Sequence, residues 1–207
     1  MKKGFTLVLL FGFLTVYTQA QNFGGGLIIG ISTSQVGGDN LAGFNKAGPI
    51  IGIFANRKVS NLLELQMEMT YIHKGSNNPN MNNTQHSNSS VADIFLSYIE
   101  IPFLVKHKQN ERLEIEGGLQ TAYLINGYYR DIYGKIEWGG TNPFINYDIG
   151  LLLGMSYKYS DRVSLNTRIS NSIIPIGQED YQDADIYNSS MKGKYNSVLS
   201  FTLNYNL

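Results

Sequence analysis

The 207-residue chain contains no cysteine. It therefore has no disulfide framework, no thiolate metal site and no cysteine that a lipid could modify behind an export signal. Proline is scarce, with 5 residues, and charged residues make up 15 % of the chain, against roughly 25 % in soluble domains. The formal net charge is zero. No excess charge draws the chain to nucleic acid, so we expect no nucleic-acid partner.

Long hydrophobic runs are also missing, apart from one short stretch at the N-terminus. Lys2 and Lys3 precede the apolar residues 5–17, and Thr18-Gln19-Ala20 is a small-x-small cleavage site. This stretch is too short to cross ~30 Å of hydrocarbon as a helix. We predict that residues 1–20 are a signal peptide cleaved after Ala20 and that residues 21–207 form one β-barrel domain. The exported chain is then either a soluble secreted protein or an outer-membrane barrel.

Alternation of apolar and polar residues dominates the exported part. In the segment 62–74, apolar side chains occupy every second position and charged or polar ones lie between them; the apolar positions are Leu63, Leu65, Met67, Met69 and Tyr71. Such a period of two places all apolar side chains on one face of a strand, whereas a helix would mix the two classes. The high content of Gly and Tyr, 22 and 14 residues, also suits strands in a lipid setting.

The same pattern predicts eight strands, at residues 24–34, 48–58, 62–74, 95–107, 112–126, 145–158, 163–170 and 199–207. Most run for about ten residues or more, the length that a tilted strand needs to cross a membrane. Strands of soluble proteins average ~5–6 residues. Pro102 lies inside the fourth segment and weakens that prediction, because proline cannot donate to a strand ladder.

Long and short connections alternate along the chain. The segments 35–47, 75–93, 127–142 and 171–194 are long, whereas 59–61, 108–111 and 160–161 are tight. Transmembrane barrels have short periplasmic turns and longer outer loops. We therefore predict an all-β fold, an antiparallel up-and-down transmembrane barrel of about eight strands with four outer loops and both ends in the periplasm.

The polar face carries many charges of both signs, namely Glu64, Glu68, Glu100, Lys106, Arg112, Glu114, Glu116, Asp148, Lys158 and Arg168. An eight-stranded barrel is only wide enough for side chains to fill it. We predict that these residues form a paired network in the lumen and that the apolar face meets lipid. An aromatic girdle is expected near the strand ends, from Tyr71, Tyr98, Tyr123, Tyr157, Tyr159 and Tyr205.

A second interpretation reverses the faces. The apolar residues, among them Leu65, Met67 and Leu151, would then line a soluble periplasmic barrel that binds a small apolar ligand.

We find no catalytic, cofactor-binding or metal-binding constellation. The three histidines, His73, His86 and His107, are far apart, and no G-x-S-x-G motif is present. Gly24-Gly25-Gly26 opens a strand and no helix follows, which disfavours a phosphate loop. The carboxylates of Glu64 and Glu68 lie on the same face of the strand. We favour a lumen salt-bridge network over an acid–base pair for them. The acidic stretch 179–185 reads as a solvated loop, with weak Ca²⁺ binding as its alternative.

We therefore expect no enzymatic activity and no cofactor. A rim hydrolase acting on lipid is a third hypothesis, which would require a nucleophile and a base at the barrel mouth.

Several short motifs occur in a characteristic order: Gly30-Ile31-Ser32, Gly48-Pro49, residues 71–75 (YIHKG), residues 98–102 (YIEIP), Gly117-Gly118-Leu119 and Asn126-Gly127. Over residues 23–207 the chain resembles the PorT-type outer-membrane β-barrel family of Bacteroidetes. The resemblance implies an outer-membrane location, and the namesake is linked to protein secretion and surface translocation. The last strand, ending at Leu207, resembles a signal read by the outer-membrane assembly machinery. The expected partners are outer-membrane lipid, that machinery and surface or secretion proteins.

Overall fold

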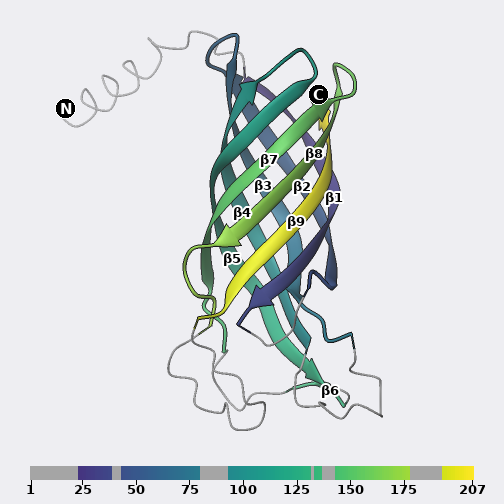
Figure 1. Cartoon of the computed structure of the whole chain (residues 1–207), viewed down its shortest axis with the longest axis vertical. Coiled ribbons are helices and arrows are strands. Elements are labelled where there is room, and N and C mark those ends of the chain that lie inside the picture. The colour runs from purple at the N-terminus through teal and green to yellow at the C-terminus, as the bar shows by residue number, and fades with distance from the viewer. Residues whose placement is uncertain (1–22, 39–42, 80–92, 132, 137–142, 178–192) are drawn as a thin grey trace, which may run out of the picture.

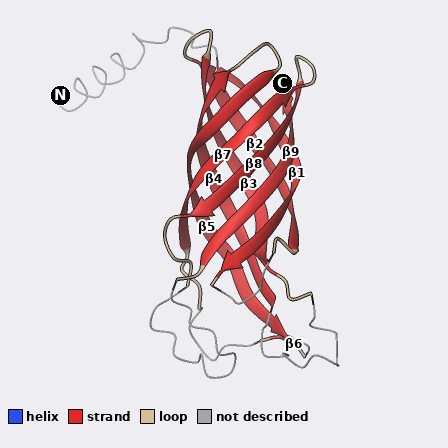
Figure 2. Cartoon of the chain, viewed as in Figure 1, coloured by secondary structure: helices blue, strands red, loops and turns tan. Residues whose placement is uncertain are grey.

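The computed structural model describes residues 23–38, 43–79, 93–131, 133–136, 143–177 and 193–207. Within them, eight strands close into an antiparallel barrel, as predicted (Figures 1 and 2). The barrel strands are β1 (Phe23–Gly37), β2 (Lys46–Lys58), β3 (Leu63–Ser76), β4 (Asp93–Lys108), β5 (Leu113–Asp131), β7 (Tyr147–Lys158), β8 (Val163–Ser172) and β9 (Tyr195–Asn206). The two-residue strand β6 (Gly134–Lys135) forms a small hairpin with the end of β5.

Each barrel strand pairs with its neighbour in the chain, and β1 closes the barrel by pairing with β9. The closing register places Gly26 opposite Asn206. Pairing of β4 with β5 completes the circle, so each barrel strand has two neighbours and the barrel has no open edge. Closure is required in lipid, because the backbone N–H and C=O groups of an unpaired edge strand would find no water to hydrogen-bond.

The connections are sorted by length, as the sequence predicted. The tight turns and the C-terminus lie at one end of the barrel, where β1 also begins, and the strand ends that the longer connections join lie at the other end, together with β6 (Figure 1). We refer to the first as the periplasmic end and to the second as the outer end, following the loop sorting of membrane barrels. The predicted signal peptide and its cleavage site fall outside the described residues.

The three periplasmic turns have the same hydrogen bonds. In the first, the backbone N–H groups of Val59 and Ser60 donate to the carbonyl of Leu63, and the Ser60 hydroxyl accepts from the N–H groups of Leu62 and Leu63. The pattern recurs at 109–113, where Asn110 is the acceptor, and at 159–163, where Ser160 is. A short polar side chain at the second turn position thus satisfies donors that the ladder leaves free.

The apolar face points outward. Leu65, Met67 and Leu151, the residues expected to hold a ligand in a soluble barrel, are 48 %, 49 % and 54 % exposed. The same holds along every barrel strand, where exposed Leu, Ile, Met and aromatic side chains alternate with buried ones. The interpretation with an apolar binding cavity is therefore wrong. An exterior this apolar requires lipid, since in water so large a patch would cause aggregation.

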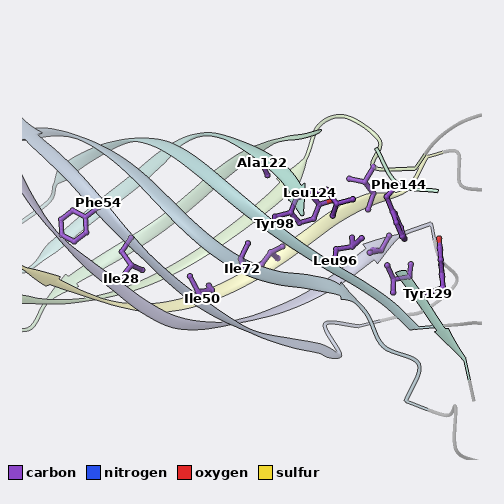
Figure 3. Close-up of a cluster of buried hydrophobic side chains, with 14 residues drawn as sticks. Ile28, Ile50, Phe54, Ile72, Leu96, Tyr98, Ala122, Leu124, Tyr129 and Phe144 are labelled. Carbon is purple, nitrogen blue, oxygen red and sulfur yellow. The ribbon is translucent and has the colours of Figure 1, made fainter. Parts of the chain in front are cut away.

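The interior is less polar than the sequence analysis suggested. Apolar side chains of the inner face pack with one another from Phe54 and Ile28 at the periplasmic end toward Tyr129 and Phe144 at the outer end (Figure 3). At the outer end they form a cap that consists of Ile94, Leu96, Tyr98, Leu124, Tyr129, Phe144 and Ile176, each at most 8 % exposed. The sequence analysis named only the charged residues of the inner face, whereas in the barrel its apolar residues also lie side by side.

A β-bulge between β4 and β5 explains one wrong prediction. Ser97 pairs with Asn126 and Tyr98 pairs with Leu124, so Ile125 is an extra residue in β5. The bulge shifts the inward and outward positions that follow it. The alternation in segment 112–126 assigns Asn126 to the polar, lumen-facing side of the strand, but Asn126 is exposed.

Tyr98 is a second correction. We expected it in the outer girdle, yet it is 0 % exposed and lies inside the barrel with Glu100 and Leu104, which share its parity on β4. Tyr71, Tyr123, Tyr157 and Tyr159 are exposed on the exterior, as a girdle requires.

One position in β4 and one in β3 are irregular. Pro102 lies within β4 and is buried, and the β3–β4 pairing is interrupted for two positions between Met67–Phe103 and Thr70–Glu100. The missing N–H of proline is thus accommodated as a local gap in one ladder. Near the outer end, Gly75 adopts φ 141°, and a Cβ there would lie 1.9 Å from the carbonyl oxygen of Ile94. Only glycine fits this close approach of β3 to β4.

Candidate functional site

The centre of the lumen is closed by one arginine held between two glutamates. The Nη1 and Nη2 atoms of Arg168 on β8 donate to the two carboxylate oxygens of Glu68 on β3, both at 2.7 Å. The Nε atom of Arg168 donates to Glu116 on β5. Because β3 and β8 are not neighbours in the sheet, this bidentate pair reaches across the barrel.

The surrounding residues complete the charge balance. The Lys106 ammonium lies 3.6 Å from Glu116, and the Gln66 amide donates to Glu68. We call Glu68, Lys106, Glu116 and Arg168 the Arg168 layer. Its two carboxylates and two cations are each at most 5 % exposed. Buried charges persist only when they are paired and hydrogen-bonded, and this layer meets that condition.

A second charged layer lies nearer the outer end. Lys74 forms ion pairs with Glu100 and Asp148, the latter at 3.8 Å. The Asn196 amide donates to Asp148 at 3.0 Å, and the Gln120 amide donates to Glu100 at 3.5 Å. Three of these residues, Glu100, Gln120 and Asp148, come from β4, β5 and β7, and all are buried. We call this group the Lys74 layer.

The space between the two layers is small. A cavity of about 30 Å³ lies there, lined by Glu68, Glu100, Gln120 and Arg168 together with small polar and apolar side chains. Such a volume holds about two water molecules. The two layers thereby bring together six of the residues predicted for a closed, paired lumen, namely Glu68, Glu100, Lys106, Glu116, Asp148 and Arg168.

The periplasmic half of the lumen is open. A vestibule of about 920 Å³ begins at the turns, and among its lining residues are Glu64, Lys106, Glu114 and Lys158. Glu64 accepts a hydrogen bond from the Asn56 amide at 2.8 Å. Glu64, Glu114 and Lys158 were predicted as part of the packed lumen. They line the mouth of the lumen instead, because side chains close the barrel interior only from the Arg168 layer toward the outer end.

Arg112 departs further from the prediction. We expected its side chain on the lumen face, but it is exposed and its Nη1 atom donates to the Tyr157 hydroxyl on the exterior at 3.3 Å. It precedes β5 as the last turn residue, so the strand alternation that assigned it inward does not apply there.

The outer mouth contains a cluster that the sequence analysis missed. The rings of Phe95 and Tyr128 stack with centroids 5.0 Å apart and planes 2° apart. The Arg130 guanidinium lies 4.5 Å from the Phe95 centroid and 2.9 Å from the Asp93 carboxylate. Asp93, Tyr128 and Arg130 fell in predicted loops, because β5 continues past the bulge for several residues beyond its expected end.

The histidines do not meet. His73 lies beside Tyr71, with its Nε2 atom 2.8 Å from the hydroxyl, near the outer end. His107 contacts Gln109 at the periplasmic end. Within the described ranges no group of three acidic, histidine or cysteine side chains is placed to hold a metal, and no helix is long and apolar enough to cross a membrane. His86 and the acidic stretch 179–185 lie outside those ranges.

Glu64 and Glu68 are separated in function by their partners, because Glu64 contacts Asn56 in the vestibule and Glu68 contacts Arg168. Glu68 thus belongs to an ion-pair network, as the sequence analysis favoured, whereas Glu64 is held by an amide and lies outside that network.

A closed antiparallel barrel with an apolar exterior and a charged, packed interior is the architecture of small outer-membrane proteins. The sequence agrees with this class. Residues 17–178 match the model of the family described as outer membrane protein beta-barrel domain, and the chain belongs to this family. No curated protein matches the chain.

Solved structures share the fold. Ail, the attachment invasion locus protein of Yersinia pestis, superimposes with a TM-score of 0.53 at 10 % identity, covering 89 % of this chain and 98 % of that one. Its complex with the heparin analogue sucrose octasulfate has a TM-score of 0.51 at 10 % identity, with 89 % and 99 % coverage. Neisserial surface protein A reaches 0.49 at 14 % identity, with 88 % and 96 % coverage. At such identities the likeness concerns the fold alone.

Proposed function

We propose that this protein is a non-enzymatic, non-conducting outer-membrane barrel that presents its outer mouth to partners at the cell surface. The observation that carries this proposal is the Arg168 layer, which joins β3, β5 and β8 across the lumen. On its periplasmic side the vestibule is open, and on its outer side lie the Lys74 layer and the apolar cap. A hydrated ion crossing the barrel would have to break two buried charge networks.

The purified barrel in a planar lipid bilayer is therefore expected to give no steady ionic current. Single-channel recording at physiological salt and both polarities measures this directly. A variant that lacks Arg168, Glu68 and Glu116, each replaced by Ala, is the matched comparison, since it removes the ion pairs of Arg168 across the lumen without touching the exterior. A steady open-pore current in the wild-type barrel would contradict the proposal, whereas current confined to the triple variant would support the layer as the seal.

The interaction role rests on the outer mouth. There β5 extends 19 residues, its hairpin with β6 projects beyond the barrel, and Tyr133 between these strands is 91 % exposed (Figure 1). A projecting hairpin next to exposed aromatic and cationic side chains suits contact with another macromolecule. A link to secretion is a narrower proposal, supported only by the PorT-type resemblance.

A photo-crosslinking residue placed at Tyr133 is expected to form adducts with a surface protein in living cells. The same residue placed at Tyr159, 74 % exposed in a periplasmic turn, is the matched control. Adducts of the same sizes from both positions, or none from Tyr133, would speak against an outer interaction surface.

We further propose that residues 1–20 are cleaved after Ala20 and that the assembly machinery inserts the remaining barrel. The hydrolase hypothesis would require a nucleophile and a base together at the outer mouth; His73, the described histidine near that end, contacts the Tyr71 hydroxyl on the barrel exterior. Outer-membrane lipid, which would contact the apolar exterior, is a further proposed partner.

A further inference from the structure

The periplasmic rim of the barrel carries two rings of basic residues that face different ways. Lys58, Lys108 and Lys158 end β2, β4 and β7 and line the vestibule. Three arginines lie close to these lysines in the sequence: Arg57 directly precedes Lys58, and Arg112 and Arg162 follow Lys108 and Lys158 by four residues. None of these arginines lines the vestibule. The lysines form an inner ring and the arginines an outer one.

Each arginine of the outer ring lies against an aromatic side chain of the barrel exterior. Arg112 donates to the Tyr157 hydroxyl at 3.3 Å. Arg162 donates to the Tyr205 hydroxyl, also at 3.3 Å. The two contacts repeat because the turns at 109–113 and 159–163 share one geometry, which places the arginine at the same position in each.

The third member completes the outer ring on the opposite side of the barrel. The guanidinium of Arg57 on β2 lies 5.8 Å from the ring centroid of Phe23, its register partner on β1. The corresponding turn position in 59–63 is Leu62, so here the cation comes from the strand.

The outer ring differs from the lumen cations in its charge balance. Lys74, Lys106 and Arg168 each have a buried carboxylate partner. Among the residues that the structure describes, no carboxylate forms an ion pair with Arg57, Arg112 or Arg162. All three are exposed. An arginine fixed through one N–H still has four donors in a planar fork that suits phosphate.

The position of the outer ring of arginines along the membrane normal indicates which ligand it can reach. Arg112 and Arg162 directly precede Leu113 and Val163, which belong to the last outward row before the turns, with Tyr157 and Tyr205 as their register partners. Aromatic residues mark the membrane–water interface. The guanidinium groups therefore lie where the phosphates of the periplasmic leaflet lie.

We propose that Arg57, Arg112 and Arg162 bind the headgroup phosphates of anionic phospholipids in the periplasmic leaflet. Each aromatic partner holds its guanidinium at the interface, so the ring takes up lipid phosphate with little loss of side-chain freedom. The site is independent of the lumen and of the outer mouth, and it does not depend on the proposed surface partners.

Native mass spectrometry of the detergent-purified barrel with added phosphatidylglycerol tests the proposal. The variant Arg57→Gln/Arg112→Gln/Arg162→Gln is expected to bind the lipid more weakly by on the order of tenfold or more, since each cation at a membrane surface contributes about 1 kcal/mol. The matched control, Lys58→Gln/Lys108→Gln/Lys158→Gln, removes the same charge from the same rim but from the inner ring. It should retain wild-type binding.

Equal losses in the two variants would overturn the proposal, because they would reflect net charge alone. Unchanged binding in the arginine variant would overturn it as well, as would displacement of the lipid by millimolar inorganic phosphate, which would indicate a general anion site. A variant with lysine at all three arginine positions keeps the charge and should bind at an intermediate level. Heat-modifiable migration on a denaturing gel verifies that every variant is a folded barrel.

Discussion

Replacing Arg168 by Ala is expected to lower the free energy of unfolding by about 3–5 kcal/mol. The substitution leaves Glu68 and Glu116 buried at 2 % and 1 % exposure without the cation that joins them. An uncompensated buried charge is far more harmful than the loss of one contact, because the carboxylates cannot recover their water. Urea unfolding of the barrel in lipid vesicles, followed by the shift between folded and unfolded bands on a gel, measures the change.

The surface variant Arg162→Ala provides the comparison, because its partner is a tyrosine hydroxyl at the rim. We expect it to change the unfolding free energy by less than about 1 kcal/mol. If the Arg168 variant should fail to fold, the combination Glu68→Gln/Lys106→Met/Glu116→Gln/Arg168→Met removes every charge of the Arg168 layer and should recover much of the folded yield. Equal effects of the two single variants would mean that the Arg168 layer does not stabilise the barrel.

Replacing Leu151 by Arg is the second large effect that we expect. Leu151 lies on the exterior of β7, between Tyr147 and Tyr157, and is 54 % exposed. A cation in the middle of the lipid-facing band destabilises a barrel by roughly 2–4 kcal/mol, falling to about 0–1 kcal/mol near the interfaces. The same urea titration in vesicles gives the value.

Tyr159→Arg is the matched control for depth, since the same side chain is introduced in a periplasmic turn beyond the apolar band. A larger destabilisation by Leu151→Arg than by Tyr159→Arg is expected if β7 crosses a bilayer, because the cost of a cation rises toward the bilayer centre. A barrel that tolerated both changes equally and left the cell envelope without detergent would not have lipid around β7, and the exterior would then need another partner.

The two large effects act on opposite faces of the same strands. The pleat of a strand separates its side chains into two sets, and closure of the sheet turns one set into a lumen and the other into an exterior. In this chain the inner set combines balanced charges with apolar side chains, whereas the outer set is mainly apolar between its aromatic rows. Stability thus depends on pairing inside and on lipid outside.

Much of this architecture could be predicted from local pattern. Alternation of Leu63, Leu65 and Met67 with Glu64 and Gln66 places β3 with its faces correctly assigned, because a period of two has only one structural reading over such a length. The alternating loop lengths likewise predict the two ends, since a membrane barrel sorts its connections by side. The turns beginning at Val59, Gln109 and Tyr159 follow from their short polar residues.

Other features depend on contacts between strands, and no local pattern reports them. The extra residue Ile125 shifts the phase of β5, so Asn126 turns outward and β5 continues to Asp131, beyond its predicted end. The apolar cap arises only when Leu96, Tyr98 and Phe144 are brought together from separate elements. Such placements depend on the register of paired strands, which sequence alternation leaves open.

The sequence by itself determined that this chain forms long two-faced strands, that they close as a membrane barrel and that the charged face points inward. These properties follow from side-chain period and from the cost of exposing backbone or charge to lipid. Only the tertiary structure decided the partners. Arg168 and Glu68 are 100 positions apart, and their pairing depends on strand register and barrel width. The side chain of Arg112 was predicted in the lumen but lies on the exterior of the rim, because the geometry of its turn, and not strand alternation, directs it.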